Sequence, residues 1–262
     1  MRVRFEKWEG LGNDFVVLRD LGAPLDDAAV RRLCDRRFGV GADGVLLVET
    51  EGRTTPRMIV RNADGSRPEM CGNGLRCVAG HLLRGKAGSL VVETDAGARR
   101  CEVSAGRDEG DGVEVLVDMG VARRGPDLMA TVGGREHRFL TVDMGNPHAV
   151  SFEEHGAGAL ETLGPAVATL PPGGTNVELC HPHEGRIIVA VWERGVGPTL
   201  ACGTGACAVA AAACDTGRAS FDVPVTVVLP GGPLEITVAA GTRAVRMRGP
   251  ARRVFSGEVV IT

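Results

Sequence analysis

The 262-residue chain repeats one short motif at an interval of half its length. Residues 71–79 read CGNGLRCVA, and residues 202–210, which lie 131 positions later, read CGTGACAVA. Upstream of these segments, the dipeptide Gly-Asn that ends at Asn13 recurs at Asn146, at nearly the same distance from its cysteine. Two matched landmarks at matched spacing indicate a gene duplication. We therefore expect two similar domains, each with one copy of the motif.

The boundary between the two halves is expected in the polar, Gly-rich stretch 104–112, which reads SAGRDEGDG. The domains would then cover residues 1–112 and 113–250. Apolar runs, several of them bounded by Gly or Pro, predict strands at 45–49, 58–60, 90–93, 113–117, 187–192, 223–229 and 234–238.

Helical patterns are fewer than strand patterns. One helix is predicted over residues 26–38, with Asp26 as its N-cap and Gly39 just past its end, and another helix is predicted after each motif cysteine. Strands therefore dominate, with one or two helices in each half. This content predicts an α+β fold, or a mixed sheet around a helix, and it argues against alternating βαβ units.

Charge and hydropathy exclude several classes of partner. Thirty basic residues balance 33 acidic ones, so the formal net charge of −3 gives no nucleic-acid or membrane-surface footprint. The longest apolar run, 206–214, is less than half of the ~20 residues that span a bilayer. Residues 1–9 interleave charged and apolar residues, which is unlike a signal peptide. We expect a soluble cytoplasmic protein without nucleic-acid or membrane partners.

Composition also restricts cofactors and metals. A pyridoxal-phosphate enzyme needs a Schiff-base lysine, and the chain has only Lys7 and Lys86 to offer. None of the eight cysteines forms a C-x-x-C pair, which zinc ribbons and thioredoxin-like sites require. We expect no metal and no cofactor, and we assign most of the thiols to packing.

The two motif cysteines are the candidate catalytic residues. In each motif Cys-Gly-x-Gly precedes a run of good helix formers, which predicts that Cys71 and Cys202 each lie at a helix N-terminus. Such an end binds a carboxylate and lowers the pKa of a thiol. If the halves face each other about a pseudo-twofold axis, one thiol removes a proton from a carbon while the other returns one to its opposite face. The alternative is two buried cysteines with purely structural roles.

Six further strings support a specific resemblance. They are GLGNDF (10–15), RNADGS (61–66), MCGNGLRC (70–77), GNPH (145–148), TNVE (175–178) and ERGVGPTLACGTGACA (193–208). In type, order and spacing they resemble the motifs of diaminopimelate epimerases. The resemblance covers residues 10–208, and the chain length agrees with it.

The resemblance implies the fold, reaction and assembly of that family. The fold would be two duplicated, pseudo-twofold-related domains, each a mixed or antiparallel barrel-like sheet around a central helix, with residues 251–262 returning to the first domain. The activity would be a cofactor-independent, two-base epimerisation of LL- and meso-2,6-diaminopimelate in lysine and peptidoglycan-precursor biosynthesis. The enzyme would be a cytoplasmic homodimer.

The resemblance also assigns residues. Cys71 and Cys202 would be the acid/base pair, with His148 and Glu193 tuning the pKa of the thiols. The substrate would be bound by Asn13, Asn62, Gly72, Asn73, Asn146, Asn176, Glu193, Arg194, Gly203 and Thr204. Three positions depart from the family pattern, where Gln, Arg and Glu are common: Gly44, Gly174 and Pro198.

Two other functions stay open. A proline racemase or hydroxyproline epimerase resembles this chain in fold and thiol pair, but such enzymes tend to have His at the position of Asn73 and Asp-Arg-Ser-Pro before the second cysteine. Here Thr199-Leu-Ala precedes Cys202. A non-catalytic amino-acid-binding protein or a thiol redox sensor is the alternative from another class.

Overall fold

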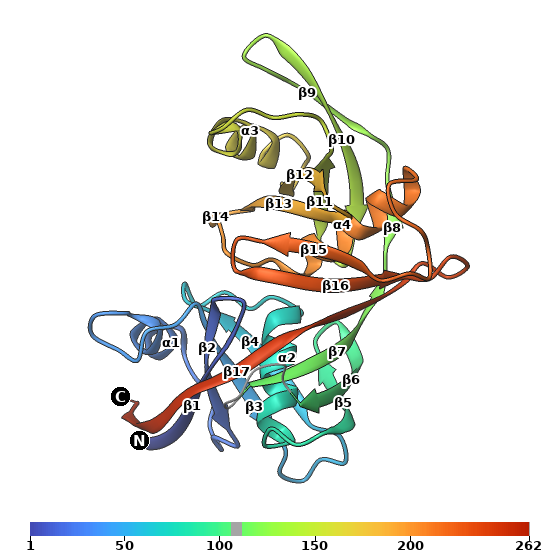
Figure 1. Ribbon diagram of the computed structural model, residues 1–262. Helices are drawn as coiled ribbons and strands as arrows, with labels where there is room; N and C mark the ends of the chain where they lie inside the picture. The colour runs from blue at the N-terminus through green and yellow to red at the C-terminus, as the bar shows by residue number, and fades with distance from the viewer. Residues whose placement is uncertain (106–111, 262) are drawn as a thin grey trace. The chain divides into compact units, whose positions relative to one another are not determined.

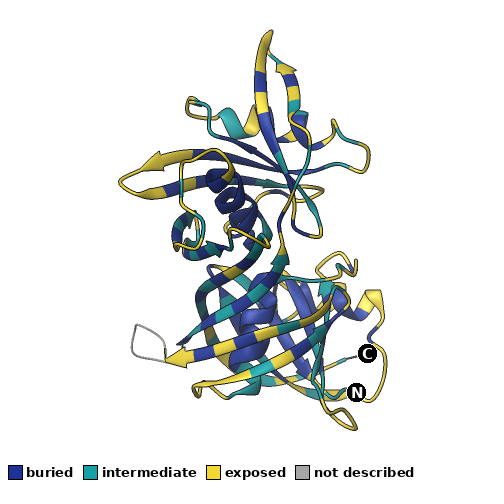
Figure 2. Ribbon diagram, turned by 90° about the vertical axis from the view of Figure 1, so that its right-hand side faces the viewer, coloured by how far each residue is buried: buried dark blue, intermediate teal, exposed yellow. Residues whose placement is uncertain are grey.

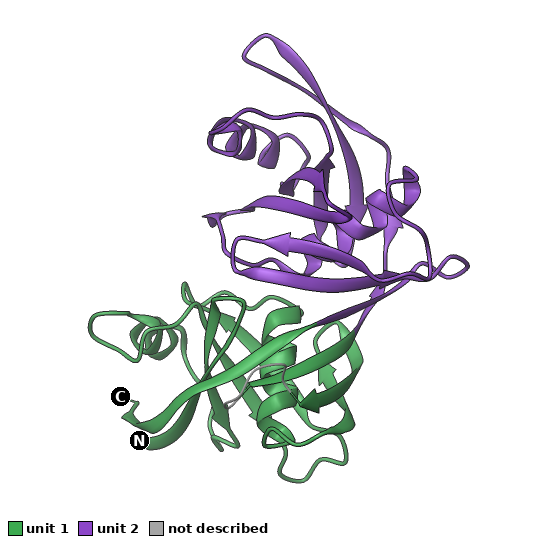
Figure 3. Cartoon of the chain, in the orientation of Figure 1, with its two compact units in different colours: residues 1–117, 249–262 green, residues 118–248 purple. Residues whose placement is uncertain are grey.

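The chain divides into two compact units (Figure 3). The computed structural model describes residues 1–105 and 112–261. Unit 1 comprises Met1–Val117 and Gly249–Thr262, and unit 2 comprises Asp118–Arg248. The boundaries expected from sequence lie after residues 112 and 250. Residues 106–111 of the expected seam lie outside the described residues.

The described strands of unit 1 pair in a closed ring, so this half is a β-barrel (Figure 1). They are β1 (Arg2–Gly10), β2 (Asn13–Arg19), β3 (Gly44–Glu49), β4 (Arg57–Asn62), β5 (Gly88–Thr94), β6 (Gly97–Ala105), β7 (Gly112–Val121) and β17 (Ala244–Val260). Each strand pairs with the next in this order, and β17 also pairs with β1. Closure protects the edges that an open sheet would expose.

Helix α2 (Gly72–Leu82) packs against the barrel strands β1 to β6 and is buried from Gly72 to Gly80 (Figure 2). Two of its glycines allow the strands to approach closely. A Cβ atom at Gly80 would lie 2.8 Å from the ring of Trp8, and one at Gly74 would lie 2.9 Å from Leu46. The motif run of small residues is therefore a packing requirement of a helix enclosed by strands.

Unit 2 repeats this topology. Its strands are β8 (Arg123–Arg124), β9 (Leu128–Val132), β10 (Arg135–Asp143), β11 (Pro147–Ser151), β12 (Asn176–His183), β13 (Arg186–Glu193), β14 (Gly197–Pro198), β15 (Val225–Leu229) and β16 (Gly232–Val238). Helix α4 (Gly203–Asp215) is the counterpart of α2 in this unit. Neither it nor any other helix in residues 1–105 and 112–261 is long and apolar enough to cross a membrane.

The order of pairings confirms the duplication. From β1 to β7 in unit 1 the pairs are antiparallel, parallel, antiparallel, parallel, antiparallel and antiparallel. From β10 through β11, β12, β13, β15 and β16 to β17 the series is the same. The fold is thus α+β, with two copies of a mixed sheet around a central helix.

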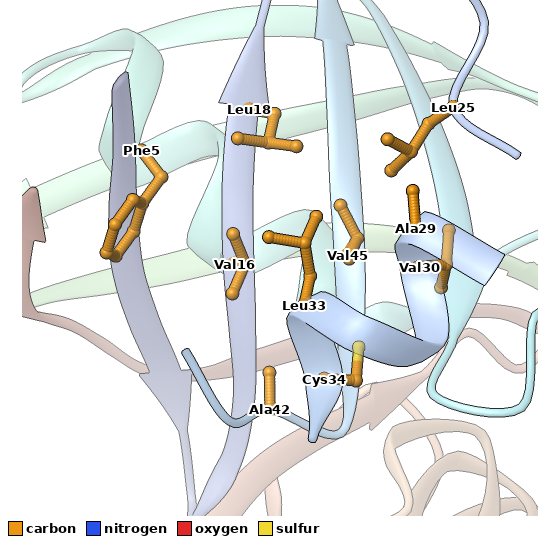
Figure 4. Close-up of a cluster of buried hydrophobic side chains, with 10 residues drawn as sticks. All are labelled: Phe5, Val16, Leu18, Leu25, Ala29, Val30, Leu33, Cys34, Ala42 and Val45. Atoms are coloured by element: carbon orange, nitrogen blue, oxygen red, sulfur yellow. The ribbon is translucent and has the colours of Figure 1, made fainter. Parts of the chain in front are cut away.

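A second helix covers the outside of each sheet. In unit 1, α1 (Asp27–Cys34) packs on a cluster from β1, β2 and β3 that includes Phe5, Leu18 and Val45 (Figure 4). In unit 2, α3 (Ala159–Ala168) packs in the same way on a cluster that includes Phe139. Each large apolar side chain buried here stabilises its unit by roughly 1.5–3 kcal/mol.

The helix predictions were right in part. Asp26 is the N-cap of α1, and its side chain accepts a hydrogen bond from the N–H of Ala29. The predicted end at residue 38 was wrong: α1 ends at Cys34 because the Asp35 side chain accepts from the N–H groups of Arg37 and Phe38 and turns the chain.

Helix α3 was not predicted, since Pro165 lies in its interior. The predicted strands are confirmed, except that β15 begins at Val225.

The buried thiols make the free energy of unfolding decrease at alkaline pH. Burial raises the pKa of Cys34 to about 11, and it also raises the pKa of Cys77, Cys180, Cys202 and Cys214. A raised pKa means that the folded chain keeps the proton that the unfolded chain releases. The free energy of unfolding is therefore unaffected below the unfolded thiol pKa of about 8.5. Above that pH it declines toward the folded pKa values, by up to about 1.4 kcal/mol for each thiol as the pH rises by one.

We predict that the urea midpoint of unfolding, measured with reductant present, falls between about pH 8 and about pH 10. The chain has no tyrosine and only two lysines, so thiols dominate titration in this range. Cys34→Val should remove part of the fall. A midpoint that stays constant over this range would contradict the raised thiol pKa values.

Candidate functional site

Both motif cysteines are helix N-caps with nearly the same geometry. Cys71 has φ −136° and ψ 116°, and its Sγ accepts from the N–H of Gly74 at 3.4 Å. Cys202 has φ −121° and ψ 105°, and its Sγ accepts from the N–H of Gly205 at 3.4 Å. The predicted placement of each cysteine at a helix start is thus confirmed, and each sulfur lies beside the N–H donors of a first helical turn.

The second glycine of each motif is needed for space. Neither Gly74 nor Gly205 has a positive φ, so a left-handed backbone conformation is not the reason for a glycine at these positions. A Cβ atom at Gly205 would lie 2.6 Å from Oε1 of Glu178 and 3.2 Å from Sγ of Cys202. At the equivalent Gly74 the nearest group is the side chain of Leu46, at 2.9 Å. The glycine therefore lets a strand side chain lie directly against the cysteine turn.

In unit 1 the Cys71 turn is joined to the start of β2 through two asparagines. Asn73, in the first turn of α2, is buried, and its Nδ2 donates to Oδ1 of Asn13 at 3.1 Å. Nδ2 of Asn13 in turn donates to Oδ2 of Asp43 at 2.8 Å. Asn62 is exposed and donates to Ser66, but it lies at the end of β4 opposite Gly44, next to Asp43.

In unit 2 the Cys202 turn is joined to β11 by the corresponding residues. The Sγ of Cys202 lies 3.6 Å from Oγ1 of Thr204, which accepts from Nδ2 of Asn146 at 3.3 Å. Oδ1 of Asn146 lies 3.1 Å from Nε2 of His148. Nδ1 of His148 lies 2.7 Å from Oε1 of Glu178, and both of these side chains are completely buried.

The other predicted residues of unit 2 lie where β12 and β13 pair. Asn176 is buried, donates to the carbonyl of Pro147 and accepts from the N–H of Arg194. The Arg194 guanidinium donates to the carbonyls of Gly173 and Gly174. Glu193 accepts from the hydroxyl of Thr199 at 2.6 Å.

Two departures from the family pattern have local reasons. A Cβ atom at Gly44 would lie 2.7 Å from the carbonyl oxygen of Arg61, so this backbone has no room for a side chain. Gly174 has φ +74°, and a Cβ there would lie 2.7 Å from Cδ of Arg194. Gly174 thus allows both the turn and the position of Arg194. The structure gives no reason for Pro198, which is exposed in β14.

Opposing effects act on the Cys202 thiol. Burial raises the pKa of Cys202 well above its usual value, and the carboxylates of Glu193 and Glu178 raise it further. The hydrogen bonds with Thr204 and with the N–H of Gly205 act in the opposite direction. Burial dominates, so Cys202 is a thiol at neutral pH.

Glu178, the last residue of the TNVE string, has no role predicted from the sequence. Its strand is buried continuously from Asn176 to Cys180, and Oε2 of Glu178 has no hydrogen-bond partner among the described residues. A charged residue between the apolar Val177 and Leu179 was the available signal. Four charged residues around Asn13 were also missed: Lys7, Asp14, Arg36 and Asp43.

The arrangement is suited to proton transfer and anion binding. Each unit presents one sulfur and the N–H groups of a helix start, the combination that holds a carboxylate beside an acid or base. Among the described residues no group of three or more His, Cys, Asp or Glu side chains is placed to hold a metal ion. Of the two lysines, Lys7 is buried and forms an ion pair with Asp14 at 2.6 Å.

We predict that Glu193→Gln accelerates alkylation of Cys202 by iodoacetamide at about pH 8, because loss of the negative charge lowers the pKa of the thiol and increases its thiolate fraction. The rate is measured by peptide mass spectrometry. Glu184→Gln, which removes an exposed carboxylate from the same unit, is the matched control and should leave the rate unchanged. Equal rates in wild type and Glu193→Gln would contradict the electrostatic contribution of Glu193.

Solved structures share this fold over the whole chain. A predicted epimerase from Pseudomonas aeruginosa superposes with a TM-score of 0.77 at 20% sequence identity, covering 99% of this chain and 100% of that one. A hydroxyproline epimerase from Agrobacterium vitis superposes with a TM-score of 0.73 at 17% identity, covering 98% of this chain and 92% of that one. At such identities the likeness shows the fold alone.

Sequence comparison is more specific. A family model described as diaminopimelate epimerase matches residues 5–125 and 140–254. A diaminopimelate epimerase of Desulforudis audaxviator is 44% identical over 98% of this chain and 99% of its own length. One from Desulfitobacterium hafniense is 43% identical over 96% of both chains. With the family model and these relatives covering nearly all of its length, the chain belongs to the diaminopimelate epimerase family of isomerases.

Proposed function

We propose that this chain is a cofactor-independent epimerase that interconverts LL- and meso-2,6-diaminopimelate in lysine and peptidoglycan-precursor biosynthesis. The observation that carries the proposal is the pair of cysteine N-caps, Cys71 and Cys202, at equivalent positions of two halves with the same topology. Membership of the family supplies the substrate class. Two thiols in equivalent turns supply the two bases that inversion of a carbon requires.

In the proposed reaction the two thiols act on one α-carbon. The thiolate of one cysteine takes the α-hydrogen as a proton and becomes a thiol, and the electron pair stays on the carbon. The thiol of the other cysteine gives its proton to the opposite face and becomes a thiolate. In the reverse direction the roles exchange. One proton leaves and one returns, so the reaction needs no oxidant and no reductant.

The backbone at the helix starts would hold the reacting carboxylate. We assign this to the N–H groups of Gly72 and Asn73 in unit 1 and of Gly203 and Thr204 in unit 2. A helix start carries a partial positive charge, which stabilises the negative charge that develops as the carbanion forms. The donors are already oriented by the helices, so little reorganisation is needed during the reaction.

The other end of the substrate carries a second ammonium and a second carboxylate. Arg194 would bind that carboxylate and Glu193 that ammonium. In the structure the Arg194 guanidinium donates to the carbonyls of Gly173 and Gly174. A substrate carboxylate is charged and therefore a stronger acceptor for these N–H groups. Side-chain amides both donate and accept, which suits a zwitterion; those assigned here are Asn13, Asn62, Asn146 and Asn176.

His148 and Glu193 would tune the thiols. Glu193 raises the pKa of Cys202 and so favours the protonated form that serves as the acid. His148 lies two hydrogen bonds from Thr204, the residue in contact with the Cys202 sulfur, through the amide of Asn146. An ammonium group of the substrate would compensate the carboxylates when Cys202 has to act as the base.

A proline racemase or hydroxyproline epimerase is the competing activity, since solved enzymes so named share the fold. Two sequence features favour diaminopimelate as the substrate: Asn at position 73, where the racemases tend to have His, and the absence of Asp-Arg-Ser-Pro before Cys202. Glu193 and Arg194 also offer groups for a second amino-acid end, which proline lacks.

Solvent exchange tests the proposal. Reduced protein is incubated with LL-diaminopimelate in D₂O, and the α-proton is followed by NMR together with chiral analysis of the product. We expect deuterium at the α-carbon and formation of the meso isomer. Exchange with proline or hydroxyproline alone would establish the competing activity. No exchange with any of them by folded, reduced protein would overturn the epimerase and leave an amino-acid-binding or redox-sensing protein.

We predict that Cys71→Ser and Cys202→Ser each lower kcat for epimerisation by at least about 100-fold, because each removes one of the two proton carriers. Thermal unfolding should change little, as serine also caps a helix. Cys214→Ser is the matched control: Cys214 lies near the other end of α4 and is 6% exposed, like Cys202. Full activity in either motif variant would overturn the two-base assignment.

The cytoplasmic location and the homodimer stay predictions. Val254, Phe255 and Val260 of β17 are each about half exposed, and association with a second copy would bury such apolar side chains. Sedimentation equilibrium measures the assembly directly.

A further inference from the structure

The side chain of Asn13 is held at both ends. Its Nδ2 donates to Oδ2 of Asp43 at 2.8 Å, and its Oδ1 accepts from Nδ2 of Asn73 at 3.1 Å. Asn73 lies two residues after Cys71 in the first turn of α2. One chain of hydrogen bonds therefore runs from Asp43 to the cysteine turn.

Asp43 is itself held by a network of charges. Nη2 of Arg36 donates to Oδ1 of Asp43 at 2.8 Å and to Oδ1 of Asp14 at 2.7 Å. The ammonium of Lys7 binds the other oxygen of Asp14 at 2.6 Å. Burial alone would raise the pKa of Asp14, but the hydrogen bonds from Arg36 and Lys7 outweigh it and lower the pKa to about 2. Asp43, the partner of Asn13, is thus anchored through Arg36, Asp14 and Lys7.

The chemistry of Asp43 determines which way the Asn13 amide points. Carboxylate oxygens only accept hydrogen bonds, so Asn13 must turn its NH₂ group to Asp43. Its carbonyl oxygen then points to Asn73, which must turn its own NH₂ group toward Asn13. An amide that flips would exchange a donor for an acceptor, and a substrate group that fits one orientation would be opposed by the other.

The equivalent asparagine of unit 2 has the opposite orientation. Nδ2 of Asn146 donates to Thr204, the counterpart of Asn73, and its Oδ1 points to Nε2 of His148. Nδ1 of His148 is bound to Glu178. The asparagine thus accepts from the helix start in unit 1 and donates to it in unit 2, because an acceptor, Asp43, holds the first and a ring N–H of His148 holds the second.

We propose that Asp43 is a positioning residue, one that fixes the amide orientations of Asn13 and Asn73 for substrate binding. The inference rests on the proposed function, because it assigns these asparagines to the substrate site. Asp43 itself does not contact the substrate in this proposal. Its effect on catalysis passes through the two amides, so it should change substrate binding more than the proton transfers.

The composition makes the orientation directly measurable. The chain has five asparagines, at 13, 62, 73, 146 and 176, and no glutamine, so the side-chain NH₂ region of a ¹⁵N–¹H spectrum contains five pairs of signals. Single Asn→Ser variants assign them. In Asp43→Asn the new amide can donate as well as accept. We expect the Asn13 and Asn73 pairs to shift and to lose protection from solvent exchange, and the Asn146 and Asn176 pairs to stay unchanged.

Kinetics give the second measurement. In Asp43→Asn we expect kcat/KM to fall about 10- to 100-fold, mainly through a higher KM. Asp127→Asn is the matched control: Asp127, like Asp43, is ion-paired with arginine, here Arg124 and Arg138, but it lies in unit 2. It should leave the kinetics and the signals of the five native asparagines unchanged. Asp43→Ala, which removes the acceptor without adding a donor, should act like Asp43→Asn.

The outcomes separate this inference from the proposed function. If wild type is active and Asp43→Asn keeps its kcat/KM or its Asn13 and Asn73 signals, the positioning role is overturned. If wild type exchanges no α-proton, the proposed function fails, and unchanged Asn13 and Asn73 signals in Asp43→Asn would overturn the hydrogen-bond assignment as well. A loss confined to kcat would also count against positioning, since it would place Asp43 in the proton transfer itself.

Discussion

The enclosure of a helix by a sheet is the constraint on which each unit depends. Helix α2 is buried from its first residue to Gly80, and every residue of α4 from Ala206 to Cys214 is buried. A helix enclosed in this way satisfies its interior backbone groups internally, but its first turn leaves N–H groups without helical partners. Those donors must be used by a cap or by a ligand. A cysteine cap is a weak acceptor, so it leaves this turn able to bind an anion while placing a sulfur beside it.

Duplication alone would give two equal turns, but the residues beneath them differ. Phe15 and Leu46 of unit 1 occupy the strand positions that His148 and Glu178 occupy in unit 2. A buried histidine–glutamate pair seldom stabilises a fold more than apolar side chains of similar size would. Here one carboxylate oxygen also lacks a hydrogen-bond partner among the described residues. The Glu178 carboxylate raises the pKa of Cys202, and the apolar side chains at the equivalent positions of unit 1 carry no such charge, so the surroundings of the two thiols are electrostatically unequal.

The repeat explains why so much of the fold could be predicted, and its divergence explains the rest. The cysteine motifs placed both central helices and both caps, because Cys-Gly-x-Gly before small residues is a strong local signal. Helix α3 was missed because Pro165 contradicts helix propensity, although its counterpart α1 was recognised; packing against Trp192 at Gly164 outweighs that preference. The partners Asp43 and Glu178 come from segments distant in sequence from the cysteines, and only the β pairing brings them to the turns.

The two asparagines show how a duplicated scaffold can present different hydrogen-bonding groups at equivalent positions. Asn13 and Asn146 occupy equivalent places, and a side-chain amide can turn either its NH₂ donor or its carbonyl acceptor toward the helix start. The group behind each amide decides its orientation: a carboxylate accepts from one, and a ring N–H donates to the other. A difference in the residue behind the asparagine thus reverses which group of its amide faces the helix start. In a protein with two copies of one fold, this permits the two halves to diverge in hydrogen bonding while each keeps its asparagine, its cysteine cap and its helix.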